Sequence, residues 1–311
     1  MPIKADRPKL VFITGPTAVG KSGLGHRLAR EVGGEIINAD SMQVYRYMNI
    51  GTAKPALTER KEVPYHLIDI VDPDQPFDAS EFRRRAQSII RELHLRRTPI
   101  LVIGGTGLYL RILQRGIFSC PKPDVEIRER WRKASQTQGA DFLWETLKKK
   151  DPLAAERIHP RDSFRLIRAL EVLELTGRPI SDWQQWDLKV EPDYEILWIG
   201  LSLDRQALYR QINLRAEKMM AQGFLGEVQG LLDRGYSTEL KSMNSLGYRH
   251  LIGVLQGKWE LKEALELLKR DTRRYAKRQM TWLGREANLN WFSAEEFDSI
   301  CFKVIDYFNQ P

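Results

Sequence analysis

The 311-residue sequence contains only two cysteines, Cys120 and Cys301, and five histidines. Cysteines so far apart provide neither a disulfide framework nor the spacing of a zinc site, and the histidines form no H-x-x-x-H cluster. No apolar stretch approaches the ~18 residues of a membrane-spanning helix, and residues 1–8 lack the apolar core of a signal peptide. We therefore expect a cytoplasmic protein without a structural zinc ion and without a membrane partner.

The composition is that of a globular chain with a sizeable core. Hydrophobic residues make up 42% of the sequence and charged residues 29%, and the length allows one large core or two domains. Lys and Arg number 49 against 41 Asp and Glu, which gives a formal net charge of +8. This excess favours a polyanionic partner, although many basic proteins bind no nucleic acid.

Residues 15–22 read GPTAVGKS and fit the phosphate-loop pattern G-x-x-x-x-G-K-[ST]. The segment follows an apolar run at 10–13 and precedes a helical pattern, so its backbone N–H groups are expected to surround an anion. Lys21 adds a positive charge, and the Ser22 hydroxyl is a candidate Mg²⁺ ligand. An ordinary glycine-rich turn is the alternative. The residues expected to bind a di- or triphosphate are Gly15, Pro16, Thr17, Ala18, Val19, Gly20, Lys21 and Ser22.

Apolar runs alternate with helical patterns over much of the chain. We expect strands at residues 10–13, 35–40, 66–71, 100–103 and 194–201. Such alternation predicts an α/β fold, with a parallel sheet covered by helices as in the P-loop NTPases. Ligands of these sheets bind at the carboxyl ends of the strands, where Thr14, Asp40 and Thr106 are expected.

Polar side chains at three positions are expected to begin helices. Ser80 and Asp204 are candidate N-caps. The segment Ser293–Glu296 has the spacing of a capping box for the last helix, which follows a long helical pattern at 259–284.

The middle of the chain has a different pattern. Residues 121–193 are rich in Arg, Lys, Trp and Gln and contain no convincing buried strand. We therefore expect an all-helical insertion at 121–193, within an α/β core formed by residues 1–120 and 194–311.

Several motifs together resemble the tRNA dimethylallyltransferases, also called tRNA isopentenyltransferases. They are the phosphate loop, NADSMQVY at 38–45, IGTAKP at 50–55, GGTGLY at 104–109 and AKRQMTW at 276–282. These motifs occur in order over nearly the whole chain, which makes them more specific than the loop alone. No Cys/His zinc finger follows, so the resemblance is to the shorter bacterial form.

This resemblance implies a reaction and its partners. The family transfers a dimethylallyl group from dimethylallyl diphosphate to N6 of the adenosine on the 3′ side of a tRNA anticodon, with Mg²⁺ and release of diphosphate. In that case the phosphate loop holds the prenyl donor and hydrolyses no ATP. The expected partners are the anticodon stem-loop of tRNA and the donor, with no obligate protein partner and a monomeric enzyme.

The resemblance also assigns catalytic roles. Lys21, Thr17 and Mg²⁺ at Ser22 are expected to stabilise the charge that develops on the leaving diphosphate. Arg215 matches a family arginine near the diphosphate, the alternative being a solvated helix arginine. Asp40 is the candidate general base for the adenine amine, the alternatives being a water-mediated Mg²⁺ partner or a turn cap.

The tRNA contacts are carried over in the same way. Residues 40–43 are expected to line a pocket for a flipped-out adenine, with the Gln43 amide reading the base; for Met42 the alternative is core packing. Thr106 matches a family contact, the alternative being a helix cap. The full set is Asp40, Ser41, Met42, Gln43, Thr106, Arg128, Phe164, Arg165, Leu166, Ile167, Arg168, Asn244, Ser245, Leu246, Gly247, Tyr248, Arg249, Lys277, Arg278, Gln279 and Trp282.

Three other functions compete with this interpretation. An adenylate isopentenyltransferase would share the core, but the large basic insertion favours a macromolecular acceptor. A P-loop small-molecule kinase using ATP leaves the insertion and the match at 277–282 unexplained. A nucleic-acid-binding protein that has lost catalysis is disfavoured by the presence of Lys21, Ser22 and Asp40.

Overall fold

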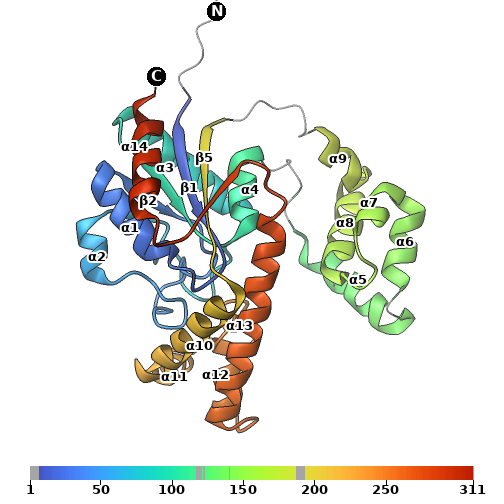
Figure 1. Ribbon diagram of the computed structural model, residues 1–311. Coiled ribbons are helices and arrows are strands. Elements are labelled where there is room, and N and C mark those ends of the chain that lie inside the picture. Colours follow the sequence, from blue (N-terminus) through green and yellow to red (C-terminus); the bar gives the residue numbers. More distant parts are fainter. Residues whose placement is uncertain (1–6, 117–120, 122, 140, 187–192, 311) are drawn as a thin grey trace, which may run out of the picture. The chain divides into compact units, whose positions relative to one another are not determined.

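The computed structural model describes residues 7–116, 121, 123–139, 141–186 and 193–310 (Figure 1). The chain divides into two compact units, which we call the core unit (Met1–Gln114 with Asp193–Pro311) and the helical unit (Arg115–Pro192). The sequence analysis placed the insertion at 121–193. Residues 117–120, which include Cys120, and residues 187–192 lie beside those boundaries and outside the described residues.

The core unit contains a six-stranded sheet in the order β3-β2-β4-β1-β5-β6, and every pairing is parallel. The strands are β1 (Lys9–Thr14), β2 (Glu35–Asn38), β3 (Tyr65–His66), β4 (Ile100–Ile103), β5 (Glu195–Leu201) and β6 (Leu289–Phe292). The central strands β1 and β4 are almost entirely buried and apolar, as expected where helices cover both faces of a parallel sheet. The expected α/β fold is therefore confirmed.

One strand prediction was wrong in its extent, and one strand was not predicted. The strand expected at 66–71 ends after His66, because Leu67 (φ 63°) and Asp69 (φ 55°) adopt left-handed backbone conformations that a strand does not accept. The edge strand β6 was missed, since its four residues carry no long apolar run. Leu289 is buried while Trp291 is partly exposed.

Helices cover both faces of the sheet (Figure 1). On one face α1 (Lys21–Val32) packs beside α14 (Phe297–Asn309), and their apolar side chains share a core with β1 and β5. On the other face lie α3 (Ala79–Leu95) and α4 (Gly107–Arg115), where Phe82 and Tyr109 stack with ring centroids 4.2 Å apart. The short helix α2 spans Leu57–Glu62.

Helix starts follow the expected chemistry at one of three positions. The Asp204 carboxylate accepts from the backbone N–H groups of Gln206 and Ala207 and caps α10, as predicted. Asp78, rather than Ser80, caps α3 by accepting from Glu81 N at 2.9 Å. The Ser293 N–H donates to Glu296 Oε2 at 2.7 Å, as in a capping box. However, α14 begins only at Phe297, so this turn precedes the helix and does not open it.

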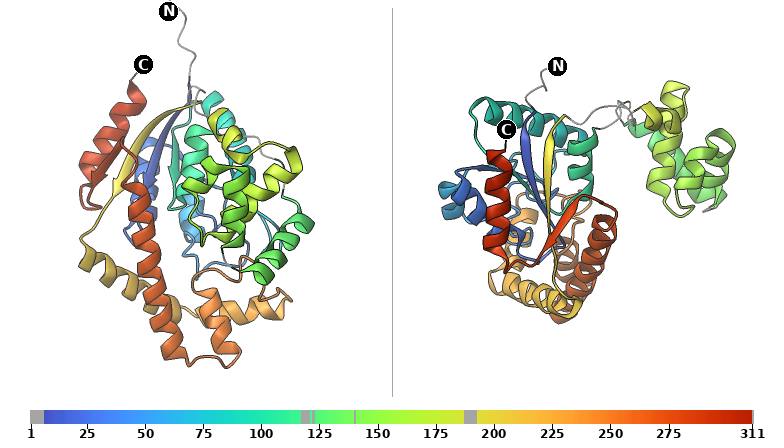
Figure 2. Two further views of the ribbon diagram at one scale, coloured as in Figure 1. Left: turned by 90° about the vertical axis from the view of Figure 1, so that its right-hand side faces the viewer. Right: turned by 45° about the horizontal axis from the view of Figure 1, so that its top comes forward.

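Four further helices gather beyond the carboxyl ends of the strands (Figures 1 and 2). They are α10 (Arg205–Ala221), α11 (Phe224–Asp233), α12 (Tyr248–Leu255) and α13 (Leu261–Leu283). Helices α10 and α12 both pack against α13, and α11 contacts α10 and α12. This group encloses the edge of the sheet where the strand-end motifs lie.

The helical unit has its own core. Its helices are α5 (Val125–Gln138), α6 (Phe142–Lys150), α7 (Pro152–Arg157), α8 (Ser163–Thr176) and α9 (Ile180–Trp186). Leu143, Leu147, Leu166 and Leu170 are among the buried residues that pack together. Across the described parts of both units, no helix has the length and apolarity needed to cross a lipid bilayer.

Gly104 permits the close approach of β4 to β2, and this generates a stability prediction. A Cβ atom at Gly104 would lie 2.1 Å from the backbone oxygen of Ala39. Gly104→Ala should therefore lower the free energy of unfolding by about 1–3 kcal/mol, because backbone rather than a side chain must move. Urea unfolding followed by circular dichroism measures this change.

Gly226→Ala is the matched control, since a Cβ at this helical position meets nothing within 4 Å. It should leave stability unchanged or raise it by up to about 1 kcal/mol. Equal stability of the Gly104 variant and the original chain would contradict the proposed packing.

Candidate active site

The phosphate loop joins β1 to α1 through an irregular backbone. Gly15, Ala18 and Gly20 have φ values of 150°, 67° and 101°. A Cβ at Gly15 would lie 2.6 Å from the backbone oxygen of Leu201, so the loop passes too close to β5 for any other residue. These features give the loop the conformation expected of an anion-binding turn.

Lys21 lies against the inside of this loop. Its Nζ donates to the backbone oxygens of Gly15 at 3.0 Å and Pro16 at 2.7 Å. Burial is the main cause of a pKa of Lys21 lowered to about 7; the nearby Arg215 contributes to this shift, whereas Asp40 opposes it. An anion bound in the loop would favour the charged form of this lysine.

Three of the expected catalytic side chains meet beside the loop. Arg215 Nη1 donates to the Thr17 hydroxyl at 3.4 Å. Burial lowers the pKa of Arg215, while the Asp40 carboxylate acts in the opposite direction. Asp40 Oδ1 accepts from Met42 N at 2.8 Å, which is the turn-capping bond considered from the sequence. Among the described residues Oδ2 of Asp40 has no hydrogen bond and is free to accept one from a ligand.

Gln279 connects the phosphate loop to the loop after β4. Its Oε1 accepts from Thr17 N at 2.8 Å and its Nε2 donates to Gly105 O at 2.9 Å. A Cβ at Gly105 would lie 2.3 Å from Nε2, and one at Gly107 would lie 2.5 Å from the Trp282 ring. The glycines of the GGTG segment therefore make room for side chains of α13.

Thr106, in the same segment, faces a neighbouring loop. Its Oγ1 accepts from Ser41 N at 3.1 Å, and its backbone N–H donates to Ala39 O at 3.3 Å. The hydroxyl thus fixes the backbone beside Asp40.

Two cavities open on the site. The first has a volume of about 570 Å³, the second of about 930 Å³, and Arg215 and Met219 line both. The first is lined by Thr17 and Asp40. The second is lined by Ala18, Gly20, Lys21 and Ser22. The phosphate loop therefore faces one cavity with its Lys21 side and presents Thr17 to the other.

A cluster of cations borders the first cavity. The Asp271 carboxylate accepts from Arg249 Nη2 at 2.7 Å, Arg270 Nε at 3.0 Å and Arg274 Nη1 at 3.5 Å, and it contacts His250 Nε2 at 3.2 Å. Burial alone would raise the pKa of Asp271, but the bonds from Arg270, His250 and Arg249 outweigh it and lower the pKa. One carboxylate thus binds three arginines, of which Arg249 and Arg274 line the cavity.

Many residues expected to bind tRNA line this first cavity. They are Asp40, Ser41, Met42, Asn244, Ser245, Leu246, Gly247, Tyr248, Arg249 and Arg278. Gln43 is buried instead, and its Nε2 donates to the backbone oxygens of Thr52 at 3.1 Å and Ala53 at 3.4 Å. The structure therefore gives the Gln43 amide a loop-fixing role in place of the expected base contact.

Two other expected contacts pack within the protein: Gln279 is buried and Trp282 is half-buried. The Gln279 amide binds the two loops and is not free to contact tRNA. In the same segment Lys277 and Arg278 are exposed and remain the candidates for such a contact. Trp282 packs over Gly107, and the guanidinium of Arg111 lies 5.5 Å from its ring centroid.

The helical unit holds the remaining residues. Arg128 and Arg168 both bind the buried carboxylate of Glu171, at 3.0 and 2.6 Å. The side chain of Leu166 is fully buried in the core, whereas Ile167 belongs to the core and also lines a surface cavity with Arg128 and Phe164. Phe164 and Arg165 are exposed and remain the candidates in this run.

The chemistry of the second cavity suits Mg²⁺ bound together with phosphate. Ser22 is exposed there, next to Lys21. No three His, Cys, Asp or Glu side chains in the described residues gather as a metal site. Mg²⁺ is often held by few protein ligands together with phosphate oxygens and water, and a serine at this place in the loop meets that requirement.

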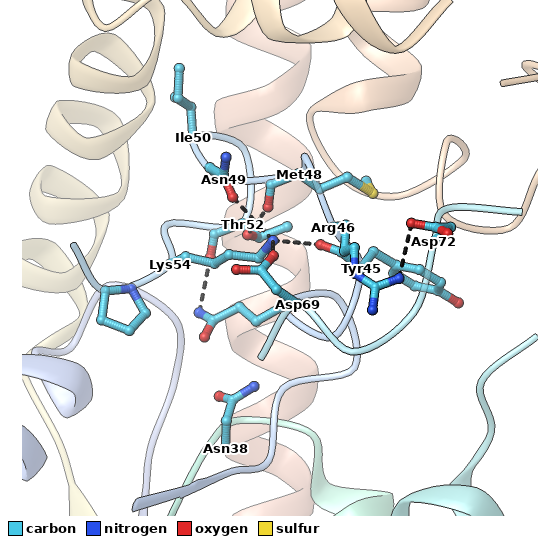
Figure 3. A network of polar contacts seen from close by, with 12 residues as sticks. Asn38, Tyr45, Arg46, Met48, Asn49, Ile50, Thr52, Lys54, Asp69 and Asp72 are labelled. Atoms are coloured by element: carbon cyan, nitrogen blue, oxygen red, sulfur yellow. Dashed lines mark hydrogen bonds and ion pairs between the residues drawn. The ribbon is translucent and has the colours of Figure 1, made fainter. Parts of the chain in front are cut away.

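A buried ion pair beside the second cavity was not assigned from the sequence (Figure 3). Lys54 Nζ donates to Asp69 Oδ1 at 2.5 Å, Tyr45 O at 2.5 Å and Asn49 Oδ1 at 3.2 Å. Burial lowers the pKa of Lys54, opposed by the bond to Asp69. Lys54 lies in the motif at 50–55, but a single loop lysine has no pattern that reveals its partner.

Comparison with known proteins identifies the family. The model of the IPP transferase family matches residues 43–286 of this chain. The chain belongs to the IPP transferase family. Its expected membership, stated from the motifs, is therefore confirmed.

Curated members of the IPP transferase family match over nearly the full length. "tRNA dimethylallyltransferase 2" of Geotalea uraniireducens is 49% identical and covers 97% of this chain and 98% of its own. "tRNA dimethylallyltransferase" of Geobacter sulfurreducens is 46% identical, with the same two coverages.

Solved structures of IPP transferases share the fold. The full-length tRNA isopentenylpyrophosphate transferase of Bacillus halodurans aligns with a TM-score of 0.72 and 38% identity over 97% of both chains. A eukaryotic dimethylallyltransferase acting on tRNA aligns with a TM-score of 0.80 and 27% identity, over 96% of this chain and 77% of its own.

The lowered pKa of Lys21 predicts a proton linkage. At pH 8 a lysine with a pKa of about 7 is mostly neutral, and a bound anion restores its charge, so binding of inorganic diphosphate should take up about one proton. Titration calorimetry in buffers of different ionisation enthalpy measures this uptake, which should fade below pH 6.

Lys21→Met should bind diphosphate more weakly and without this uptake. Lys218→Met, which removes an exposed lysine of the same cavity, should retain it. Diphosphate binding at pH 8 without proton uptake by the original chain would contradict the assignment.

Proposed function

We propose that this chain transfers a dimethylallyl group from dimethylallyl diphosphate to N6 of the adenosine on the 3′ side of the anticodon of tRNA. The names of its full-length relatives support this reaction. One structural observation carries it: the phosphate loop and the Asp40 carboxylate face two cavities that share Arg215 and Met219. A donor and an acceptor thus have separate spaces that meet at one point.

The donor occupies the second cavity in this proposal. Its diphosphate lies in the phosphate loop, where backbone N–H groups, Lys21 and Arg215 supply positive charge. Mg²⁺ at Ser22 would neutralise part of the charge of the leaving group. The Thr17 N–H is bonded to Gln279, and the Thr17 side chain lines the first cavity, so its hydroxyl, next to Arg215, meets the donor only where the two cavities join.

The acceptor adenine occupies the first cavity. N6 attacks the allylic carbon, the bond from this carbon to the diphosphate oxygen breaks, and the electron pair leaves with the diphosphate. Oδ2 of Asp40 accepts the proton that N6 gives up. A base within a folded tRNA reaches such a cavity only by leaving its stack, so the proposal includes base flipping.

The remaining tRNA contacts are made by exposed cations and one exposed aromatic ring. Arg249, Arg274, Lys277 and Arg278 are exposed on α12 and α13, and three of them border the first cavity. In the helical unit Phe164 and Arg165 are both exposed, and the guanidinium of Arg128 lies 5.9 Å from the centroid of the Phe164 ring. Guanidinium groups suit phosphate, and an exposed ring suits an unpaired base, so both are expected to contact the anticodon stem-loop.

One assay separates this reaction from its competitors. Labelled dimethylallyl diphosphate is offered with unmodified tRNA or with AMP, and γ-labelled ATP is offered separately with a metabolite extract. We expect label in the tRNA alone. Label in AMP, or transfer of the ATP label to a small molecule, would overturn the proposed function.

The role of Asp40 predicts a specific defect. Asp40→Asn should slow single-turnover prenyl transfer by about 10²–10⁴-fold while tRNA affinity stays close to normal, because the amide cannot take the N6 proton. The measurement is transfer of labelled donor under saturating tRNA, with affinity measured by filter binding. Asp74→Asn, on an exposed loop, is the matched control and should be fully active. Normal transfer by the Asp40 variant would contradict a base at this position.

A further inference from the structure

Glu227, on α11, binds a turn that is far away in the sequence. Its Oε2 accepts from the backbone N–H groups of Asn49 at 2.8 Å and Ile50 at 2.7 Å, and its Oε1 accepts from Gly51 N at 3.1 Å. The Tyr248 hydroxyl donates to Oε1 at 2.6 Å. Three successive amides around one carboxylate form an anion nest, here filled by a side chain of the protein itself.

The same helix also packs against the turn. A Cβ at Gly51 would lie 2.3 Å from the Phe224 ring and 2.6 Å from the Tyr248 ring, and these rings meet edge to face with centroids 5.0 Å apart. Phe224 begins α11, one turn before Glu227. The turn is thus held to α11 by both packing and hydrogen bonds.

The far end of the turn is held by the buried Lys54 (Figure 3). Its ammonium joins Asp69 and the backbone oxygen of Tyr45, and Arg60 Nη1 donates to the other Asp69 oxygen at 2.5 Å. Between the two attachments Ala53 has a φ of 49°, a conformation that needs support from its surroundings. Residues 49–54, which we call the cavity turn, are therefore fixed at both ends.

The cavity turn forms part of the wall of both cavities. Asn49, Ile50, Ala53 and Lys54 line the second cavity, whereas Gly51 and Thr52 line the first. Of the three amides that Glu227 holds, two belong to residues that line the second cavity, Asn49 and Ile50, and one belongs to Gly51 of the first. A shift of this end of the turn is therefore expected to change the space offered to the donor more than the space offered to the acceptor.

We propose that Glu227 is a positioning residue for the prenyl donor: by holding the amides of the cavity turn it fixes the wall of the donor cavity. This inference rests on the proposed function. It assigns Glu227 no contact with either substrate, so the expected defect lies in donor binding rather than in chemistry.

The test is a comparison of steady-state constants for Glu227→Gln. The amide NH₂ of glutamine cannot accept from the turn, so at least one backbone N–H loses its partner. We expect the donor KM to rise about tenfold or more, with a smaller rise in the tRNA KM and little change in kcat. Glu227→Asp keeps the carboxylate on a shorter side chain and should give a smaller rise in the donor KM.

Asp233→Asn is the matched control, since it removes the same charge from the same helix at a side chain bonded only to Gln229 among the described residues. It should leave both KM values unchanged. If thermal unfolding shows that Glu227→Gln does not fold, the test is made with Glu227→Asp, by comparing the rise in its donor KM with the rise in its tRNA KM.

Two outcomes overturn the inference: an unchanged donor KM in the folded Glu227 variants, or equal rises in the KM of donor and tRNA. Because the original chain is measured in the same assay, absence of transfer by that chain would refute the proposed function instead.

Discussion

The amide of one glutamine, Gln279, holds the site together. It accepts from the phosphate loop at Thr17 and donates to the loop after β4 at Gly105, so α13 is joined to both. The Gln279 side chain is buried, where an unpaired polar group is costly, and its amide is therefore strongly constrained. The segment at 104–107 is glycine-rich because a side chain at Gly105 would collide with this amide, which lies in the segment at 276–282.

Two cations, Lys21 and Arg215, lie together beside the phosphate loop. Burial lowers the pKa values of both side chains, and the nearby Asp40 carboxylate opposes both shifts. A diphosphate in the loop would supply the charge that offsets their desolvation. Beside the first cavity a carboxylate of the protein itself offsets the positive charge, because Asp271 binds Arg249, Arg270 and Arg274.

Local patterns predicted much of the fold and the phosphate loop. The loop spacing, the apolar runs of β1 and β4 and the cap at Asp204 are each encoded within a few residues. Long-range partners were not predictable. Glu227 is 178 residues from Asn49, and Lys54 meets Asp69 only because positive φ values bend the chain after His66.

The roles of single side chains were the hardest to predict. Gln43 and Gln279 lie in motifs typical of substrate contact, yet their amides bind the protein's own loops. Leu166 and Ile167 lie in a run with exposed neighbours, but the helical periodicity of α8 directs them into a core. Burial separates such positions from solvent-facing ones, and a motif match alone does not contain that information.

The central claim is that the phosphate loop holds a prenyl donor while Asp40 faces the adenine. A crystal structure with an unreactive thiolo analogue of dimethylallyl diphosphate and an unmodified anticodon stem-loop tests it most directly. The account predicts diphosphate oxygens on the loop amides and Lys21, and the adenine N6 within about 3.2 Å of an Asp40 oxygen. A donor bound away from the loop, or an adenine beyond the reach of Asp40, would contradict it.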